Sequence, residues 1–87
     1  MNTNLYTHIM NVNTFIEGFL TRNSFVNTGD NTYVNKECSV KILKDCYEIG
    51  FVDPDFGEVT MYTDGLSIPQ LAGVLSWHNL IDRNYSK

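Results

Sequence analysis

Long apolar runs are absent from this sequence of 87 residues. A membrane-spanning helix needs about 18 or more consecutive apolar residues, and no segment approaches that length. The first residues, MNTNLYTHIMNVN, lack the basic and then apolar order of a signal peptide. Cysteine is scarce too, with only Cys38 and Cys46, which favours free thiols in a reducing compartment. We therefore expect a soluble, cytoplasmic protein that forms a single domain over residues 1–87.

Basic residues are missing from most of the second half of the chain. No Lys or Arg lies between Lys44 and Arg83. The acids in that interval are Asp45, Glu48, Asp53, Asp55, Glu58, Asp64 and Asp82. With a net charge of −4, the protein lacks the surplus of cations that neutralises phosphates, so we expect no direct contact with nucleic acid. Lys36, Lys41 and Lys44 are interpreted as charges that protect an edge strand from aggregation.

Catalytic signatures are absent as well. The sequence contains no P-loop, no G-x-G-x-x-G and no G-x-S-x-G. The candidate nucleophiles and bases are Cys38, Cys46, Ser67, Ser76, His8 and His78. Ser67 is better placed to cap a helix, and His78 lies on or beside an apolar stripe, which is typical of a core histidine. We therefore expect no enzyme activity, no catalytic residues and no cofactor.

The spacing of possible ligands does not favour either of two metal sites. His8, Cys38, Cys46 and His78 could supply four zinc ligands, but paired zinc ligands usually lie closer together in sequence. From Asp53 onward, the glycine and the later acid do not fall where a calcium-binding EF-hand loop needs them. The segment DPDFG instead predicts a hairpin turn, in which Gly57 takes a positive φ. Metal binding remains a third functional alternative.

Hydrophobic spacing predicts an N-terminal helix. Its apolar stripe consists of Leu5, Ile9, Val12, Phe15, Ile16, Phe19 and Leu20. Asn2 or Thr3 could cap it, although the pair Thr14 and Glu17 allows a second start. Whether the helix is broken near Asn11–Asn13 is left open. Residues 23–31 are expected to form a loop, with a turn at Gly29 and Asp30.

Period-two alternation predicts three strands, around Val40–Ile42, Tyr47–Phe51 and Val59–Met61. With a turn at Lys44-Asp45, Val40 faces Ile49, Ile42 faces Tyr47 and Lys41 faces Glu48. With a loop from Asp53 to Gly57, Phe51 faces Val59, Ile49 faces Met61 and Tyr47 faces Thr63. The same face is then apolar in all three strands, which supports an antiparallel meander.

A capping box predicts the C-terminal helix. Ser67 is the N-cap, Pro69 lies in the first turn, and the helix is expected to end near Arg83, with Asn84 as the C-cap. The predicted fold is α+β: an N-terminal helix, a three-stranded antiparallel β-meander and a C-terminal helix, with both helices on one sheet face. The opposite face, called the outer face below, is expected to carry Lys41, Leu43, Cys46, Glu48, Val52, Glu58, Thr60 and Tyr62.

The acids gather on the predicted second hairpin, residues 47–64, which we call the acidic hairpin. Such a negative surface steers association with a basic partner, and exposed aromatics beside it can anchor the contact. The predicted function is non-enzymatic binding of a protein with a basic surface. The predicted partner-binding residues are Glu48, Asp53, Asp55, Phe56, Glu58, Tyr62 and Asp64. The alternative is a self-associating subunit, such as a homodimer, that uses the outer face around Val52, Thr60 and Tyr62.

In size, acidity and richness in Asn and Tyr, the chain resembles the small accessory proteins of bacteriophages and mobile elements. Some of those proteins inhibit host defence nucleases by occupying a basic nucleic-acid channel. The resemblance implies an inhibitor of a host nucleic-acid-binding protein. It rests on size, charge and the missing catalytic motifs, and no motif residue carries it.

Overall fold

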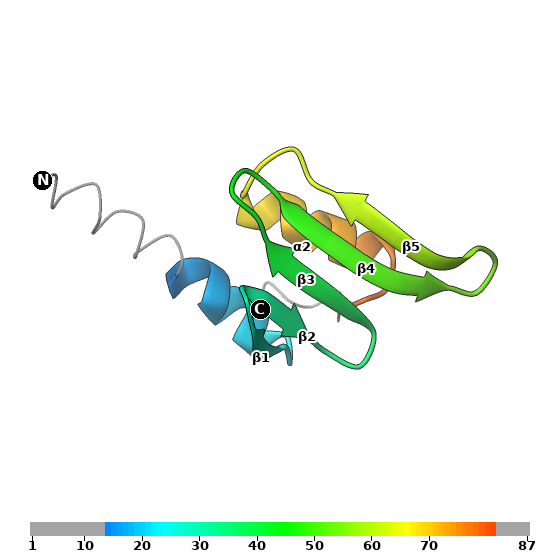
Figure 1. Ribbon diagram of the computed structural model, residues 1–87, viewed down its shortest axis with the longest axis horizontal. Helices are drawn as coiled ribbons and strands as arrows, with labels where there is room; N and C mark the ends of the chain where they lie inside the picture. Colours follow the sequence, from blue (N-terminus) through cyan, green and yellow to red (C-terminus); the bar gives the residue numbers. More distant parts are fainter. Residues whose placement is uncertain (1–13, 82–87) are drawn as a thin grey trace, which may run out of the picture.

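An antiparallel sheet of five strands forms the centre of the protein, in a computed structural model that describes residues 14–81. The strands follow one another in chain order across the sheet (Figure 1). They are β1 (Val26–Gly29), β2 (Thr32–Val34), β3 (Cys38–Ile42), β4 (Tyr47–Asp53) and β5 (Gly57–Tyr62). Residues 14–22 are helical and precede the sheet, and the helix α2 (Ile68–Trp77) follows it.

The predicted three-stranded meander is wrong, because the sheet has two more strands. β1 lies within the segment expected to be a loop, and β2 follows it directly. Asp30 and Asn31 join them, with φ values of 54° and 60°. Positive φ at both central residues is what a two-residue type I′ hairpin turn requires, and Asp and Asn tolerate it. The turn lies one residue later than the predicted turn at Gly29 and Asp30, and the short strands on either side of it are not predicted by the sequence.

The predicted register of the other three strands is confirmed. Val40 pairs with Ile49, and Ile49 pairs with Met61, so one apolar row crosses β3, β4 and β5. The loop between β4 and β5 is shorter than expected, because Asp53 still pairs with Gly57. At the other end, the Thr63 amide donates to the Tyr47 carbonyl (3.1 Å), and the Tyr47 amide donates to the Thr63 hydroxyl (2.9 Å). A side chain therefore completes the ladder there.

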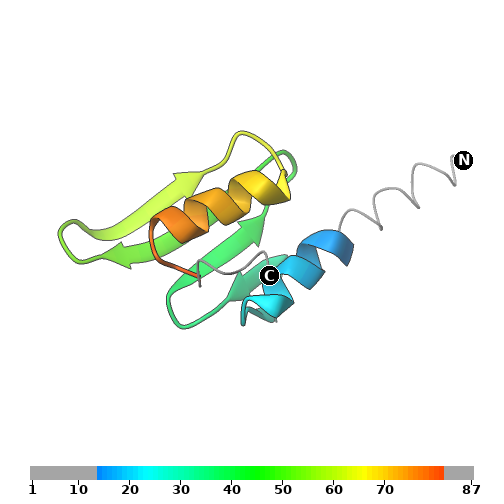
Figure 2. The same cartoon turned by 180° about the vertical axis from the view of Figure 1, so that it is seen from behind.

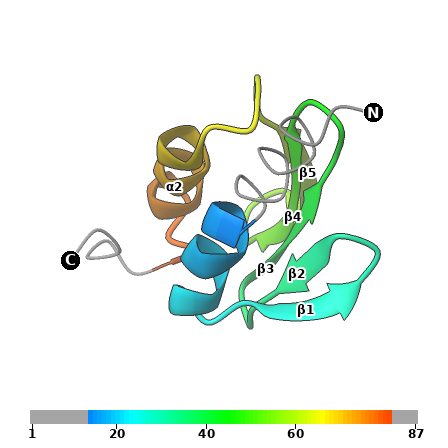
Figure 3. The same ribbon diagram turned by 90° about the vertical axis from the view of Figure 1, so that its left-hand side faces the viewer.

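Both helices pack on the same face of the sheet, as predicted (Figure 3). Residues 14–22 lie beside β1 and β2, and α2 lies across β3, β4 and β5 (Figure 2). The core between these layers contains Ile16, Phe19, Leu20, Phe25, Tyr33, Cys38, Val40, Tyr47, Ile49, Phe51, Leu71, Ala72, Leu75, Leu80 and Ile81. Two buried tyrosines of the sheet also form hydrogen bonds to the helical side. The Tyr47 hydroxyl donates to the carbonyl of Leu66, just before α2 (2.8 Å), and the Tyr33 hydroxyl donates to Glu17 in the first helical segment (2.9 Å).

The start of α2 is as predicted, and its end is not. The Ser67 hydroxyl accepts from the Gln70 amide (3.3 Å), which makes Ser67 the N-cap. The helix ends at Trp77 instead of near Arg83, because Asn79 takes a left-handed φ of 59°. The Asn79 amide donates to the Ser76 carbonyl (3.0 Å) and the Leu80 amide to the Leu75 carbonyl (2.8 Å), which is a Schellman motif. The chain then turns back and buries Leu80 and Ile81.

Some expectations fall outside the described residues. These are the start of the first helix, its possible break near Asn11–Asn13, the side chain of His8 and the cap at Asn84. Within the described part of the chain, neither helical segment has the length and apolar content needed to cross a membrane.

Candidate partner-binding surface

The tip of the acidic hairpin is a turn held by side-chain hydrogen bonds, and a turn at this position is what the sequence predicts. The Asp53 carboxylate accepts from the amides of Asp55 (2.7 Å) and Phe56 (3.1 Å), and Gly57 has a φ of +80°. Pro54 fits the first central position of the turn, where its ring presets φ. Because Asp53 is half-buried and engaged with the turn, its role is to hold the loop. Asp55 and Phe56 are held out into solvent, and Phe56 is 84% exposed.

The outer face of the hairpin continues this surface. Glu58 pairs with Val52, which is 71% exposed, directly behind the tip. Further along, Glu48 pairs with Tyr62, whose hydroxyl donates to the Glu48 carboxylate (3.2 Å). The negative charge of Glu48 is the main cause that raises the pKa of Tyr62. Glu48 also pairs with Lys41 across β3 and is half-buried, so its charge is less available to a partner than that of Glu58.

The structure thus divides the seven predicted partner-binding residues into two groups. Asp53, Asp55, Phe56 and Glu58 lie at or next to the tip, which extends past the end of α2 (Figures 1 and 2). Glu48, Tyr62 and Asp64 lie toward the other end of the hairpin. Glu58 and Tyr62 are four positions apart on β5, which is about 13 Å in a strand. A partner that contacts both groups must therefore span at least this distance.

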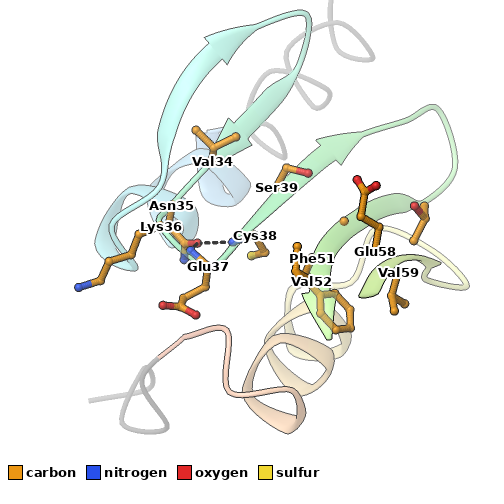
Figure 4. A pocket seen from close by; sticks show the side chains of 12 residues that line it. Val34, Asn35, Lys36, Glu37, Cys38, Ser39, Phe51, Val52, Glu58 and Val59 are labelled. Carbon is orange, nitrogen blue, oxygen red and sulfur yellow. Dashed lines mark hydrogen bonds between the residues drawn. The ribbon is translucent and has the colours of Figure 1, made fainter. Parts of the chain in front are cut away.

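A shallow hollow of about 420 Å³ lies on the outer face beside this surface. It forms because Ser39 and Gly50 pair across β3 and β4 and provide little side-chain bulk. Figure 4 shows Val34, Val52 and Glu58 among the residues that line it. Val34 and the exposed Val26 of β1 extend the apolar part of the outer face. Sequence reasoning missed both, because it assigned Val26 to a loop over residues 23–31 and assigned no strand to Val34.

The lysines do not form the predicted edge. Lys41 lies on β3, which is flanked by β2 and β4 and is therefore an interior strand. Tyr33 on the neighbouring strand β2 is buried and donates to Glu17. The interpretation of these lysines as protection of an edge strand is wrong for Lys41, and the error follows from the two missed strands.

The candidate zinc ligands within the described residues do not converge. Cys38 lies in the core, whereas Cys46 pairs with Leu43 through the backbone next to the β3–β4 turn. The ring of His78 packs against the ring of Phe51, with centroids 4.9 Å apart, which matches the prediction of a histidine packed on the core. No group of three or more His, Cys, Asp or Glu side chains within residues 14–81 is arranged to hold a metal ion.

Burial makes the stability of the fold sensitive to high pH. Burial, with a smaller effect of the Glu37 charge, raises the pKa of Cys38 from 9.0 to about 12, and burial raises the pKa of Tyr47 from 10.0 to about 12. Both groups keep their protons in the folded state above the pH at which the unfolded chain loses them. Their stabilising effect is therefore complete below pH 9.0 and is lost as pH rises toward about 12.

We expect the midpoint of thermal unfolding to fall steadily over this pH range. Because Cys38 has the lower ordinary pKa, Cys38→Ala is expected to flatten the first part of the decline and to leave the later part, which depends on Tyr47. Circular dichroism melts between pH 8 and pH 11 measure both profiles. Parallel profiles for the two proteins would contradict the assignment to Cys38.

No protein family matches this chain, and no curated protein or solved structure is significantly similar to it.

Proposed function

We propose that the protein is a non-enzymatic binding module that contacts a basic protein surface through the acidic hairpin. The exposed Phe56 at the tip, between Asp55 and Glu58, carries this proposal. An aromatic side chain held out by a rigid turn loses little conformational freedom on binding and can fill a pocket of the partner. The acids around it attract a basic surface and set the orientation of the encounter.

Charge distribution supports the same proposal. The acidic hairpin contains no Lys or Arg, so no base within it neutralises its acids. Lys41 on β3 pairs with Glu48 and not with the acids at the tip. An inhibitor that covers a basic nucleic-acid channel of another protein would use such a surface. That specific role rests on the resemblance in size and charge described above.

A matched pair of charge reversals tests the proposal. Glu58→Lys changes the charge beside Phe56, whereas Asp45→Lys makes the same change in net charge at the opposite end of β4, in an exposed turn. Proteins captured from the native host by the wild-type chain are identified, and their association rates are measured at low salt. We expect Glu58→Lys to slow association about 10-fold or more and Asp45→Lys to have much less effect. Equal rates for both variants would contradict the proposal.

A charge reversal at Asp53 is not a suitable test. Its carboxylate accepts two amides of the turn, so Asp53→Lys would disturb the loop as well as the charge. Asp53→Asn keeps an acceptor oxygen in place and removes only the charge. It is the suitable third member of the set, and circular dichroism should show an unchanged fold.

Self-association is the second candidate function. The exposed Val26, Val52 and Tyr62 favour it, because they are large apolar side chains on the outer face, which no described helix covers. Sedimentation at increasing concentration distinguishes the two functions. A monomer at high concentration removes this candidate and leaves the binding module.

A further inference from the structure

The sheet ends in two edge strands that differ in regularity. β1 has four residues, and its register with β2 shifts between Asn27 and Gly29. A bulge of this kind twists an edge and makes it a poor template for another strand. β5 has six residues, and every one of them pairs with β4 without a shift. Of the two edges of the described sheet, β5 is therefore the one that can accept a further strand.

The hydrogen-bond pattern shows which backbone groups of β5 point outward. The Thr63 amide donates to the Tyr47 carbonyl, so these two residues form a hydrogen-bonded pair. Such pairs alternate with non-hydrogen-bonded pairs in an antiparallel ladder. Val59 and Met61 therefore bond to β4, whereas Glu58, Thr60 and Tyr62 direct their N–H and C=O groups to the free edge. No described segment runs along that side of β5 (Figures 1 and 2).

The side chains at this edge specify the charge of a partner. Glu58, Thr60 and Tyr62 are exposed. Asp55 lies beyond one end of the strand and Asp64 beyond the other. Edge strands are commonly protected from pairing by lysine or proline, and β5 contains neither. The edge therefore combines unpaired backbone groups with negative charge along its whole length.

We propose that β5 binds an extended, basic segment of a protein as a sixth strand of the sheet. Main-chain hydrogen bonds from Glu58, Thr60 and Tyr62 supply affinity. Alternate side chains of the segment lie on the outer face, where a Lys or Arg is placed beside Glu58. The proposal rests on the proposed function and names its mode of binding. A strand along β5 also contacts both groups of predicted residues, which are about 13 Å apart.

A second copy of the chain is a poorer occupant of this edge. Two β5 strands paired antiparallel about Thr60 would place the tip of one hairpin, with Asp55, beside Asp64 of the other copy. Like charges in such positions destabilise strand pairing. A basic segment has the opposite effect, because it neutralises the same acids.

The test uses two synthetic peptides with equal charge. One alternates Lys with Val and can form a strand, and the other replaces each Val with Pro, which cannot donate to a ladder. Amide hydrogen exchange of the full chain is measured with each peptide. We expect the Lys-Val peptide to slow exchange at Glu58, Thr60 and Tyr62 at least 10-fold and to bind at least 10-fold more tightly than the Lys-Pro peptide.

A variant of the edge provides the matched control. Thr60→Pro removes an amide that points to the free edge and none that bonds to β4, so the hairpin is expected to remain folded. It is expected to abolish binding of the Lys-Val peptide, whereas Thr60→Val, which keeps the amide, is not. If Thr60→Pro does not fold, protection of the Glu58, Thr60 and Tyr62 amides in the wild-type chain is the remaining test of the sixth strand.

The other outcomes separate this inference from the proposed function. Equal binding of both peptides, or binding without protection of these three amides, would overturn the sixth strand and leave a charged binding surface. Protection in the free protein at dimer-forming concentrations would assign the edge to a second copy and overturn the inference. A third outcome is that Glu58→Lys and Asp45→Lys associate with the captured protein at equal rates, while the Lys-Val peptide still protects the three amides of the wild-type chain. That outcome would overturn the host-protein proposal instead.

Discussion

Replacement of Leu75 by alanine is expected to lower the free energy of unfolding by about 2–5 kcal/mol. Leu75 is fully buried on α2, at the face that packs against the sheet. The truncation removes apolar contacts and leaves a cavity that a rigid two-layer core cannot close. Small domains are stable by only roughly 5–15 kcal/mol, so this loss is a large part of the total. Urea denaturation monitored by circular dichroism measures it.

Trp77→Ala is the control on the same helix. Trp77 is 80% exposed, so its truncation removes a larger side chain but almost no buried contact. We expect a change within about 0.5 kcal/mol. Comparable losses for the two variants would contradict the placement of α2 with Leu75 inward and Trp77 outward.

The second large effect is expected at Asn35, in the loop between β2 and β3. Its side-chain oxygen accepts from the amides of Glu37 (2.7 Å) and Cys38 (2.8 Å), and its side-chain nitrogen donates to the Leu80 carbonyl (3.1 Å). One side chain therefore shapes a loop and connects it to the segment that follows α2. With three hydrogen bonds lost, Asn35→Ala is expected to cost about 2–4 kcal/mol.

Asn35→Asp separates the two roles of this residue. The carboxylate keeps both acceptor positions for the loop and loses the donor to Leu80. We expect the free energy of unfolding to lie between those of the wild type and Asn35→Ala. A loss below about 1 kcal/mol for Asn35→Ala would show that water replaces these bonds and would contradict a structural role for the side chain.

The central part of the fold could be predicted because two independent signals agreed. Tyr47, Ile49 and Phe51 alternate clearly, and the turns on either side keep their partners on the same face. β1 and β2 gave no such signal, since β2 has three residues and only Tyr33 of them is buried. Asn and Gly in this region favour a loop on local grounds, and tertiary pairing with β3 overrides that preference.

The end of α2 shows a different limit. The apolar spacing continues through His78 and Ile81, so periodicity alone extends the helix. Asn79 stops it by adopting a left-handed conformation, and Leu80 and Ile81 are buried by the reversal of the chain instead of by the helix. An asparagine within a helical pattern is compatible with either outcome until the packing around it is known.

For the candidate surface, the sequence identified which residues are charged but not how they are arranged. The turn at Asp53–Gly57 was predictable from its own residue types, because Pro and Gly specify local dihedral angles. That β5 is an edge strand was not predictable in the same way. Edge position depends on the total number and order of strands, which is a property of the whole sheet.

The consecutive strand order also affects how the chain folds. Each strand of the described sheet pairs only with strands that are adjacent in the chain, through short connections. The pairings between strands are therefore local in the sequence, and local pairings favour faster folding than the pairing of distant strands in sandwiches. During synthesis, each strand from β2 to β5 can pair with the preceding strand as soon as it emerges. Among the described residues β5 is the last strand to join, so its free edge is the most recently formed edge of the sheet.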